Sequence, residues 1–165
     1  MSAARLFAGV VVIAACALFG SVRNAEALRR LKTAEGLRSD ISEAEHLLTG
    51  GRKDLFAICE TLSFRGACAD LWRDISNEMQ NGSGFYTAFS KARKPDCGRE
   101  AAAELERLAA LLGKGDAAAE SERLRDAAKR LGAIVENMQK NRAEKCRLTS
   151  SLSLLLGLCL ALLLI

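Results

Sequence analysis

Apolar residues gather at both ends of the chain, in two runs that contain no charged side chain. The first run covers 6–22, which is 17 residues, and the second covers 148–165, which is 18 residues. A transmembrane α-helix needs about 17 to 25 predominantly apolar residues to cross the hydrocarbon core. We therefore expect membrane anchors at 6–22 and 148–165, with a separate domain at 23–147 between them.

Between these runs, apolar residues recur every three or four positions, which is the spacing of one face of an α-helix. The first such stretch continues from the first apolar run, with apolar positions at Leu31, Leu37, Ile41, Ala44 and Leu48. Breaks are expected where glycine, proline or turn residues gather, namely at 50–51, near Gly66, at 81–84, at 94–96 and at 113–115. The short helices between these breaks should begin near Asp54, Cys68, Phe85 and Arg99.

The final helix should begin after Asp116, whose carboxylate can accept the free N–H groups of the first turn. Nothing in the sequence interrupts this helix before the second apolar run. A seam at heptad spacing, suited to packing against a neighbouring helix, is expected at Leu124, Ala127, Leu131, Ile134 and Met138. The predicted fold class is all-α: a bundle of about six helices between two terminal transmembrane helices, with the last helix long and continuous with the second span.

Charge is confined to the middle of the chain and is nearly balanced there. Residues 23–147 hold 23 of the 24 Lys and Arg and all 20 Asp and Glu, a net charge of +3. Proteins that bind nucleic acid usually carry a more concentrated basic face. We therefore expect no nucleic-acid partner, and the single proline, Pro95, is consistent with a helical domain.

Motifs for catalysis or cofactor binding are missing from the sequence. The single histidine, His46, is not paired with a cysteine or serine in a recognisable motif. The stretch Gly50-Gly51-Arg-Lys53 lacks the spacing of a phosphate-binding loop and has no strand before it. Acidic residues alternate with basic ones at helical spacing, which is typical of solvated helix faces. We expect neither an enzyme nor a cofactor.

The cysteines are too widely spaced for a zinc site. The four in the middle, Cys59, Cys68, Cys97 and Cys146, lie 9, 29 and 49 residues apart. A structural zinc site normally contains close pairs of ligands such as C-x-x-C. A disulfide framework is typical of secreted rather than cytoplasmic domains, so we expect free thiols and no metal.

Basic residues flank both apolar runs on the side of the middle domain. Arg23, Arg29, Arg30 and Lys32 follow the first run, and Lys140, Arg142, Lys145 and Arg147 precede the second. Because Lys and Arg are enriched in cytoplasmic segments next to membrane spans, the domain should lie in the cytoplasm. Both termini should then lie on the opposite side of the cell membrane.

The first apolar run has two alternative interpretations. It resembles a secretory signal, with Arg5 before the run and small residues after it. Ile13-Ala14-Ala15-Cys16 also resembles a lipoprotein processing site, which would make Cys16 the lipid attachment point of an exported helical lipoprotein. An uncleaved anchor is favoured because only one Arg precedes the run and because the basic residues after it oppose export.

Several stretches together resemble the stage III sporulation protein AB family. They are Gly82-Ser-Gly-Phe-Tyr-Thr-Ala-Phe89, Leu111-Leu-Gly-Lys-Gly-Asp116, and Lys140-Asn-Arg-Ala-Glu-Lys-Cys-Arg147 leading into Leu154-Leu-Leu-Gly-Leu158. The resemblance extends over essentially the whole chain. Two positions depart from the family's Leu-Gly-x-Ser-Asp-x-x-x-Gln pattern, because Gly115 replaces the serine and Glu120 replaces the glutamine.

This resemblance implies a non-enzymatic part of a sporulation complex in the mother-cell membrane, which is the outer membrane around the forespore. The family's soluble domain is similar to the inner-membrane platform domains of type II secretion and type IV pilus systems. The implied partners are membrane lipid, other subunits of the complex and a secretion-type cytoplasmic ATPase, and homo-oligomerisation stays open. The candidate turn or interface positions are Gly84, Phe85, Phe89, Gly113, Gly115, Asp116 and Gly157.

A different class of function, a membrane sensor with a helical bundle between two spans, is also consistent with two anchors. In such receptors the bundle faces away from the cytoplasm, whereas the basic flanks of this chain predict the reverse. We therefore favour an adaptor over a sensor.

Overall fold

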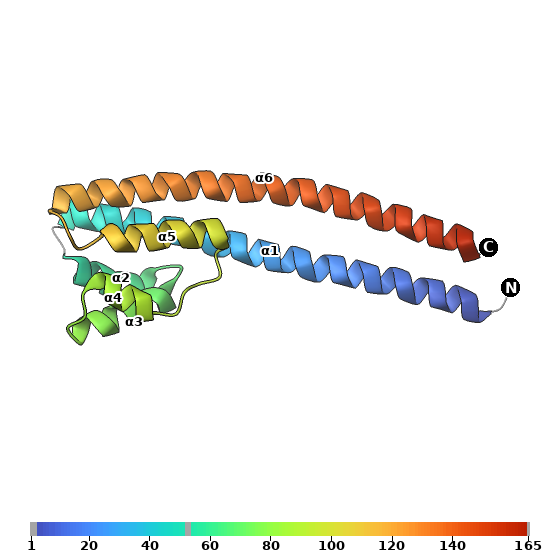
Figure 1. The fold of residues 1–165 in the computed structure, drawn as a ribbon, viewed down its shortest axis with the longest axis horizontal. Helices are drawn as coiled ribbons and strands as arrows, with labels where there is room; N and C mark the ends of the chain where they lie inside the picture. Colours follow the sequence, from blue (N-terminus) through green and yellow to red (C-terminus); the bar gives the residue numbers. More distant parts are fainter. Residues whose placement is uncertain (1–2, 52–53, 165) are drawn as a thin grey trace. The chain divides into compact units, whose positions relative to one another are not determined.

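The computed structural model describes residues 3–51 and 54–164, with side chains described for residues 22, 24–50 and 54–144. Its helices are α1 (Ala3–Gly51), α2 (Leu55–Arg65), α3 (Ala69–Gln80), α4 (Phe85–Lys91), α5 (Arg99–Leu111) and α6 (Ala117–Leu164) (Figure 1). The described residues thus form six helices and no strand. The prediction of an all-α chain with about six helices is confirmed.

The chain forms two compact units, which we describe separately. The bundle unit is Arg30–Asn137, and the paired-segment unit combines Met1–Arg29 with Met138–Ile165. Within the paired-segment unit, Arg142 Nε donates to Asn24 Oδ1 at 3.2 Å and so joins α1 to α6.

The two predicted membrane spans remain predictions. Among the described residues, no helix combines the length and the apolar content that crossing a membrane requires. Apart from Val22, the spans at 6–22 and 148–165 lie outside the residues whose side chains are described.

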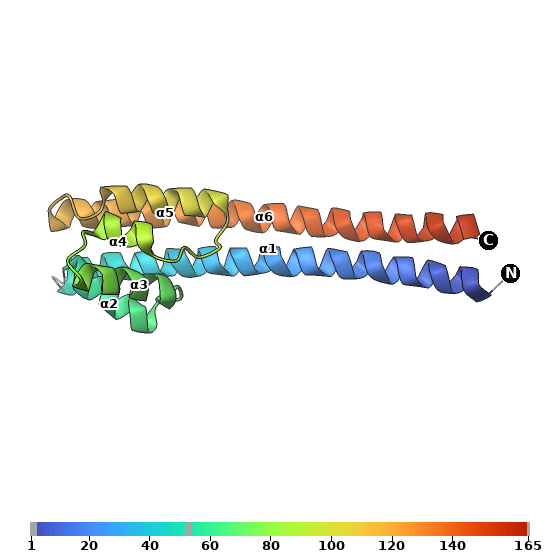
Figure 2. The same ribbon diagram turned by 60° about the horizontal axis from the view of Figure 1, so that its bottom comes forward.

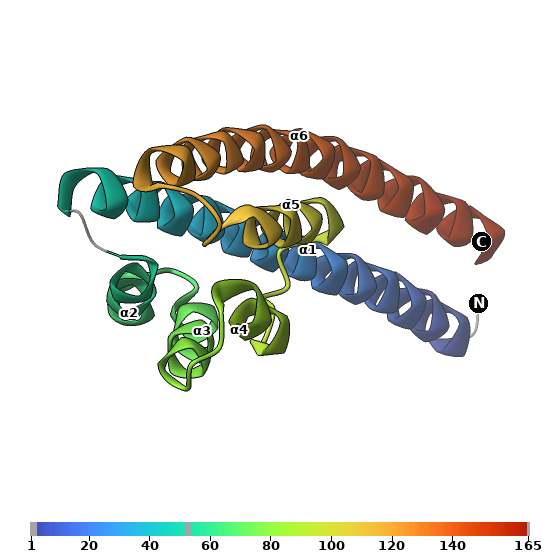
Figure 3. The ribbon, with the colours of Figure 1, turned by 60° about the vertical axis from the view of Figure 1, so that its left-hand side comes forward.

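In the bundle unit, the second half of α1 pairs with the first half of α6. Arg125 on α6 contacts Glu45 on α1 at 2.7 Å, and the hydroxyls of Thr49 and Ser121 are 3.2 Å apart. Helices α2, α3 and α4 lie together on the other side of α1 from α6 (Figures 1 and 3), and α5 runs along α6 (Figure 2).

The core of α1 agrees with its predicted apolar face. All the predicted positions are buried: Leu31, Leu37, Ile41, Ala44 and Leu48. Trp72 and Ile75 on α3 are buried as well, and so are Leu105 and Leu108 on α5. Spacing along α1 was sufficient to predict its buried positions because one helix face packs against the rest of the bundle.

The predicted heptad seam of α6 is partly wrong. Its buried positions are Glu120, Leu124, Ala127, Leu131 and Val135, whereas Ile134 and Met138 are only half-buried. A straight α-helix has 3.6 residues per turn, so a buried stripe drifts away from a strict seven-residue repeat. Among the described side chains of α6, the buried stripe therefore includes Val135 in place of Ile134 and departs from a strict seven-residue repeat.

Local signals position the ends of the helices. Asp54 caps α2 by accepting the N–H of Ala57 at 2.9 Å. Asp116 accepts the N–H of Ala119 at 2.9 Å in the first turn of α6, as predicted. Carboxylates at these positions satisfy N–H groups that the helix itself leaves unpaired and lie at the positive end of the helix dipole.

A buried carboxylate on α1 holds the turn between α2 and α3. Asp40 is only 3% exposed. Its Oδ1 accepts the N–H of Ala67 at 2.7 Å, and its Oδ2 accepts the N–H of Cys68 and the indole Nε1–H of Trp72, both at 2.8 Å. Three donors thus offset the cost of burying this charge, and we call this arrangement the Asp40 cluster.

Candidate functional site

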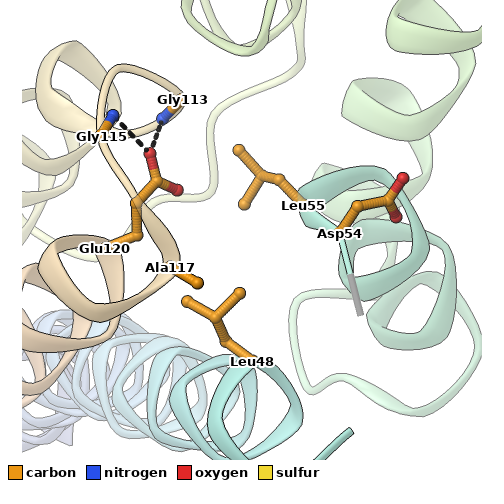
Figure 4. A pocket seen from close by; sticks show the side chains of 7 residues that line it. All are labelled: Leu48, Asp54, Leu55, Gly113, Gly115, Ala117 and Glu120. Carbon is orange, nitrogen blue, oxygen red and sulfur yellow. Dashed lines mark hydrogen bonds between the residues drawn. The ribbon is translucent and has the colours of Figure 1, made fainter. Parts of the chain in front are cut away.

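An open pocket lies where the ends of several helices meet in the bundle unit (Figure 4). It encloses about 530 Å³ and is lined by Leu48 at the end of α1, Asp54 and Leu55 at the start of α2, Gly113 and Gly115 in the turn after α5, and Ala117 and Glu120 at the start of α6. Helix ends and the turns that join them tolerate varied side chains, so a scaffold of packed helices can present a site there.

Glu120 holds the glycine turn that forms one wall of this pocket. Its Oε1 accepts the N–H of Gly113 at 2.7 Å and the N–H of Gly115 at 3.3 Å. Gly113 has a φ of +78°, a left-handed conformation that glycine adopts without the steric cost of a Cβ. The turn can therefore bend back over the start of α6, and Glu120 itself is only 6% exposed.

The other walls of the pocket are mainly apolar. Leu48, Leu55 and Ala117 direct their carbon atoms toward the space in Figure 4. Asp54 also lines the pocket, but its carboxylate points away from the space and caps α2. The pocket thus offers an aliphatic surface with one buried carboxylate in its wall.

The structure brings four of the predicted site residues to this region. Gly113 and Gly115 line the pocket, and Asp116 caps the helix that follows them. Phe85 packs beside the same turn, because a Cβ placed on Gly113 would lie 3.7 Å from Phe85 Cβ. Two of the stretches that carry the family resemblance, 82–89 and 111–116, therefore meet in space.

The predicted positions on α4 do not line the pocket. Gly84 is exposed at the N-terminus of α4, where it serves as the cap residue. Phe85 and Phe89 are buried, so in this fold they are core residues and not surface contacts, whereas Tyr86 between them is 55% exposed. Gly157 lies outside the residues whose side chains are described.

Sequence reasoning missed the role of Glu120 and the pocket itself. Apolar spacing indicates a core position for Leu48, and no motif in the sequence includes Leu55 or Ala117. One signal for Glu120 was present: an acidic residue shortly after a capping Asp can reach back to free N–H groups before the helix. The contribution of Leu48 and Leu55 depends on the meeting of α1 and α2, which spacing along one helix does not reveal.

Buried thiols in the bundle unit are poorly suited to nucleophilic chemistry. Cys59, Cys68 and Cys97 are free and buried. Burial, together with the nearby Asp54 carboxylate, raises the pKa of Cys59 to about 12. Burial raises the pKa of Cys68 to about 12 as well, with Asp40 and Cys97 as further causes. A thiol is reactive as its thiolate, which these surroundings disfavour.

Metal binding finds no support within the described part of the chain. No group of three or more His, Cys, Asp or Glu there is arranged to hold a metal ion. The pocket has one carboxylate turned toward it, whereas a stable metal site normally needs several ligands.

The family comparison covers nearly the whole chain. The model of stage III sporulation protein AB matches residues 5–165. No curated protein and no solved structure matches the chain. The resemblance expected from stretches 82–89, 111–116 and 140–147 is thereby confirmed. The chain belongs to the stage III sporulation protein AB family and has a role in sporulation.

Proposed function

We propose that the chain is a non-enzymatic adaptor of a sporulation membrane complex, which docks a secretion-type cytoplasmic ATPase and other membrane subunits. The observation that carries this proposal is the open pocket of about 530 Å³ lined by Leu48, Leu55, Ala117 and the glycine turn. An apolar concave surface with a polar group in its wall is suited to receiving a side chain from another protein. Several charged groups of the domain form solvent-exposed ion pairs, as in Lys91–Glu78 and Lys94–Glu106.

Membrane attachment is the second part of the proposal. It rests on the two uncharged runs at 6–22 and 148–165 and on the basic residues that flank both on the side of the domain. The adaptor would hold its helical domain on the cytoplasmic face of the mother-cell membrane. The alternative, a lipoprotein attached through Cys16, depends on 13–16 alone.

The proposal is tested by recovering partners with the full chain. The chain is purified from membranes of cells that have entered sporulation, and the proteins that accompany it are identified by mass spectrometry. We expect the ATPase and other membrane subunits of the complex among them. Recovery of neither class would contradict the adaptor function.

A pair of matched variants links this result to the pocket. Ala117→Phe places a ring in the pocket, whereas Ala118→Phe places the same ring on an exposed neighbouring position that does not line it. Because blocking a central contact of an interface removes most of its binding energy, we expect Ala117→Phe to lower ATPase recovery by about tenfold or more. Ala118→Phe should behave as the unchanged chain does, and equal loss with both variants would show that the pocket is not the docking site.

A further inference from the structure

One oxygen atom of Glu120 stays open to the pocket. Its Oε1 is used by the N–H groups of Gly113 and Gly115. No described residue donates a hydrogen bond to Oε2, and Figure 4 shows this oxygen turned toward the space between Glu120 and Leu55. The residue is 94% buried, since only 6% of its surface is exposed. Among the described residues no buried side-chain oxygen lacks a hydrogen-bond partner, so Oε2 is in contact with solvent through the open pocket, where a cationic donor can take the place of water.

The nearby donors of the described residues form hydrogen bonds with other acceptors. The N–H groups of Gly113 and Gly115 both bond to Oε1. The guanidinium of Arg123 donates to the carbonyl oxygen of Leu111 at 2.7 Å. Oε2 is therefore an acceptor that a guest carrying a donor could engage.

We propose that the pocket binds the side chain of a lysine or arginine that a partner protein inserts beside Glu120. The aliphatic stem would lie on Leu48, Leu55 and Ala117, and the cationic head would donate to Glu120 Oε2. Long basic side chains bury their carbon stems against apolar surface while the charged end finds a polar partner. The occupant is thus a basic, partly apolar segment of a partner, and the inference rests on the proposed docking function.

A matched pair of small probes tests the charge preference directly. The probes are n-butylguanidinium and n-butylurea, which share a four-carbon stem and a planar head but differ in charge. Each is titrated against the full chain in lipid nanodiscs, and binding is followed by saturation-transfer NMR. A hydrogen bond to a charged group strengthens binding by about tenfold or more, so we expect n-butylguanidinium to bind about ten times more tightly than n-butylurea.

Glu120→Gln is the decisive variant. The glutamine keeps an oxygen for the N–H groups of Gly113 and Gly115 but turns an NH₂ group toward the pocket in place of the open oxygen. The glycine turn should therefore persist, and n-butylguanidinium should lose its tenfold advantage, so that the two probes bind about equally well. Glu122→Gln is the matched control, because Glu122 is exposed on the same helix and does not line the pocket. It should keep the full preference.

The outcomes separate this inference from the docking function. Equal affinity of the two probes, or a cation preference that survives Glu120→Gln, overturns the inference. If Ala117→Phe still lowers ATPase recovery in that case, the adaptor proposal remains supported, and the partner would insert an apolar side chain into the pocket. A cation preference that Glu120→Gln abolishes supports a basic guest whichever subunit provides it. Circular dichroism and Trp72 fluorescence confirm that each variant is folded.

Discussion

Asp40 and Glu120 are both buried carboxylates that hold a turn by accepting backbone N–H groups, but they differ in how their oxygen atoms are used. Both oxygens of Asp40 are engaged, by Ala67, Cys68 and the indole of Trp72. Only one oxygen of Glu120 is engaged, by Gly113 and Gly115. The first group is enclosed on α1, and the second lines an open pocket.

This difference separates a residue that stabilises the fold from one that can also bind. A buried charge is tolerated when hydrogen bonds replace its lost hydration. In the Asp40 cluster, donors of the chain itself bond to both carboxylate oxygens, so neither oxygen is left for a partner. In Glu120 the chain's donors bond only to Oε1, so Oε2 is available to a partner where the pocket opens.

The largest expected difference in the free energy of unfolding is between the alanine variants of the two carboxylate residues. Asp40→Ala leaves the N–H groups of Ala67 and Cys68 and the indole of Trp72 without their acceptor, so we expect a loss of about 3 to 5 kcal/mol in the free energy of unfolding. Glu120→Ala should cost about 1 kcal/mol, because water can reach the exposed glycine turn. Denaturant unfolding of the full chain in mild detergent measures both, with Trp72, the single tryptophan, as the fluorescent reporter. Equal losses would remove the distinction between the two carboxylates.

A smaller effect distinguishes the glycines beside the two carboxylates. A Cβ on Gly66 would lie 2.6 Å from the carbonyl oxygen of Leu62 and 3.0 Å from Asp40 Oδ2. Gly66→Ala should therefore lower the free energy of unfolding by about 2 kcal/mol, as overpacking commonly does. At Gly115 the nearest atom is Nη1 of Arg123, at 3.1 Å, and this flexible end can move.

Gly115→Ser serves as the comparison for Gly66→Ala. It introduces the serine of the pattern that the chain resembles, and we expect a change within about 0.5 kcal/mol. Thermal unfolding followed by circular dichroism measures the two variants side by side. A larger loss for Gly115→Ser than for Gly66→Ala would contradict the assignment of the tighter packing to the Asp40 cluster.

The smallest expected effect is a pH dependence from Cys68 in the Asp40 cluster. Burial first, and the Asp40 carboxylate second, raise the pKa of its thiol from 9.0 to about 12. Between these two values the unfolded thiol ionises while the folded thiol stays protonated, so the free energy of unfolding falls as the pH rises. Below pH 9.0 both forms are protonated and the thiol adds no pH dependence.

Cys68→Ser isolates this contribution from that of other alkaline groups. Unfolding titrations of the two proteins across this pH range should show a shallower fall for Cys68→Ser. The same slope for both proteins would mean that the thiol ionises as readily when folded as when unfolded. Alkylation by iodoacetamide gives an independent measure, since the folded thiol should react slowly until the pH approaches its raised pKa.

Helix positions followed from the sequence where the signals are local. The expected breaks at Gly66, at 81–84 and at 113–115 all separate helices in the structure. The last helix begins after Asp116, whose carboxylate caps it as predicted. These features depend on backbone conformation and on hydrogen bonds within a few residues, so nearby residue types are sufficient to predict them.

Local sequence signals predicted only part of the candidate site. Gly113 and Gly115 were selected through the family resemblance, and both line the pocket. Glu120 departs from the family pattern, but the pattern does not predict the two hydrogen bonds that it accepts. Phe85 and Phe89 were selected with them and are buried in the core, because amphipathic spacing does not separate a core aromatic from a contact aromatic.

The sequence by itself determined the helical class, the number and approximate ends of the helices and the family, because these depend on local propensity, spacing and pattern. Tertiary structure decided which charged side chains became buried and which stayed open. Asp40 meets its donors 27 to 32 residues further along the chain. The pocket forms only because Leu48 on α1 and Glu120 on α6, which are far apart in the sequence, line the same space. Such meetings depend on how helices pack, and no periodicity within one helix specifies them.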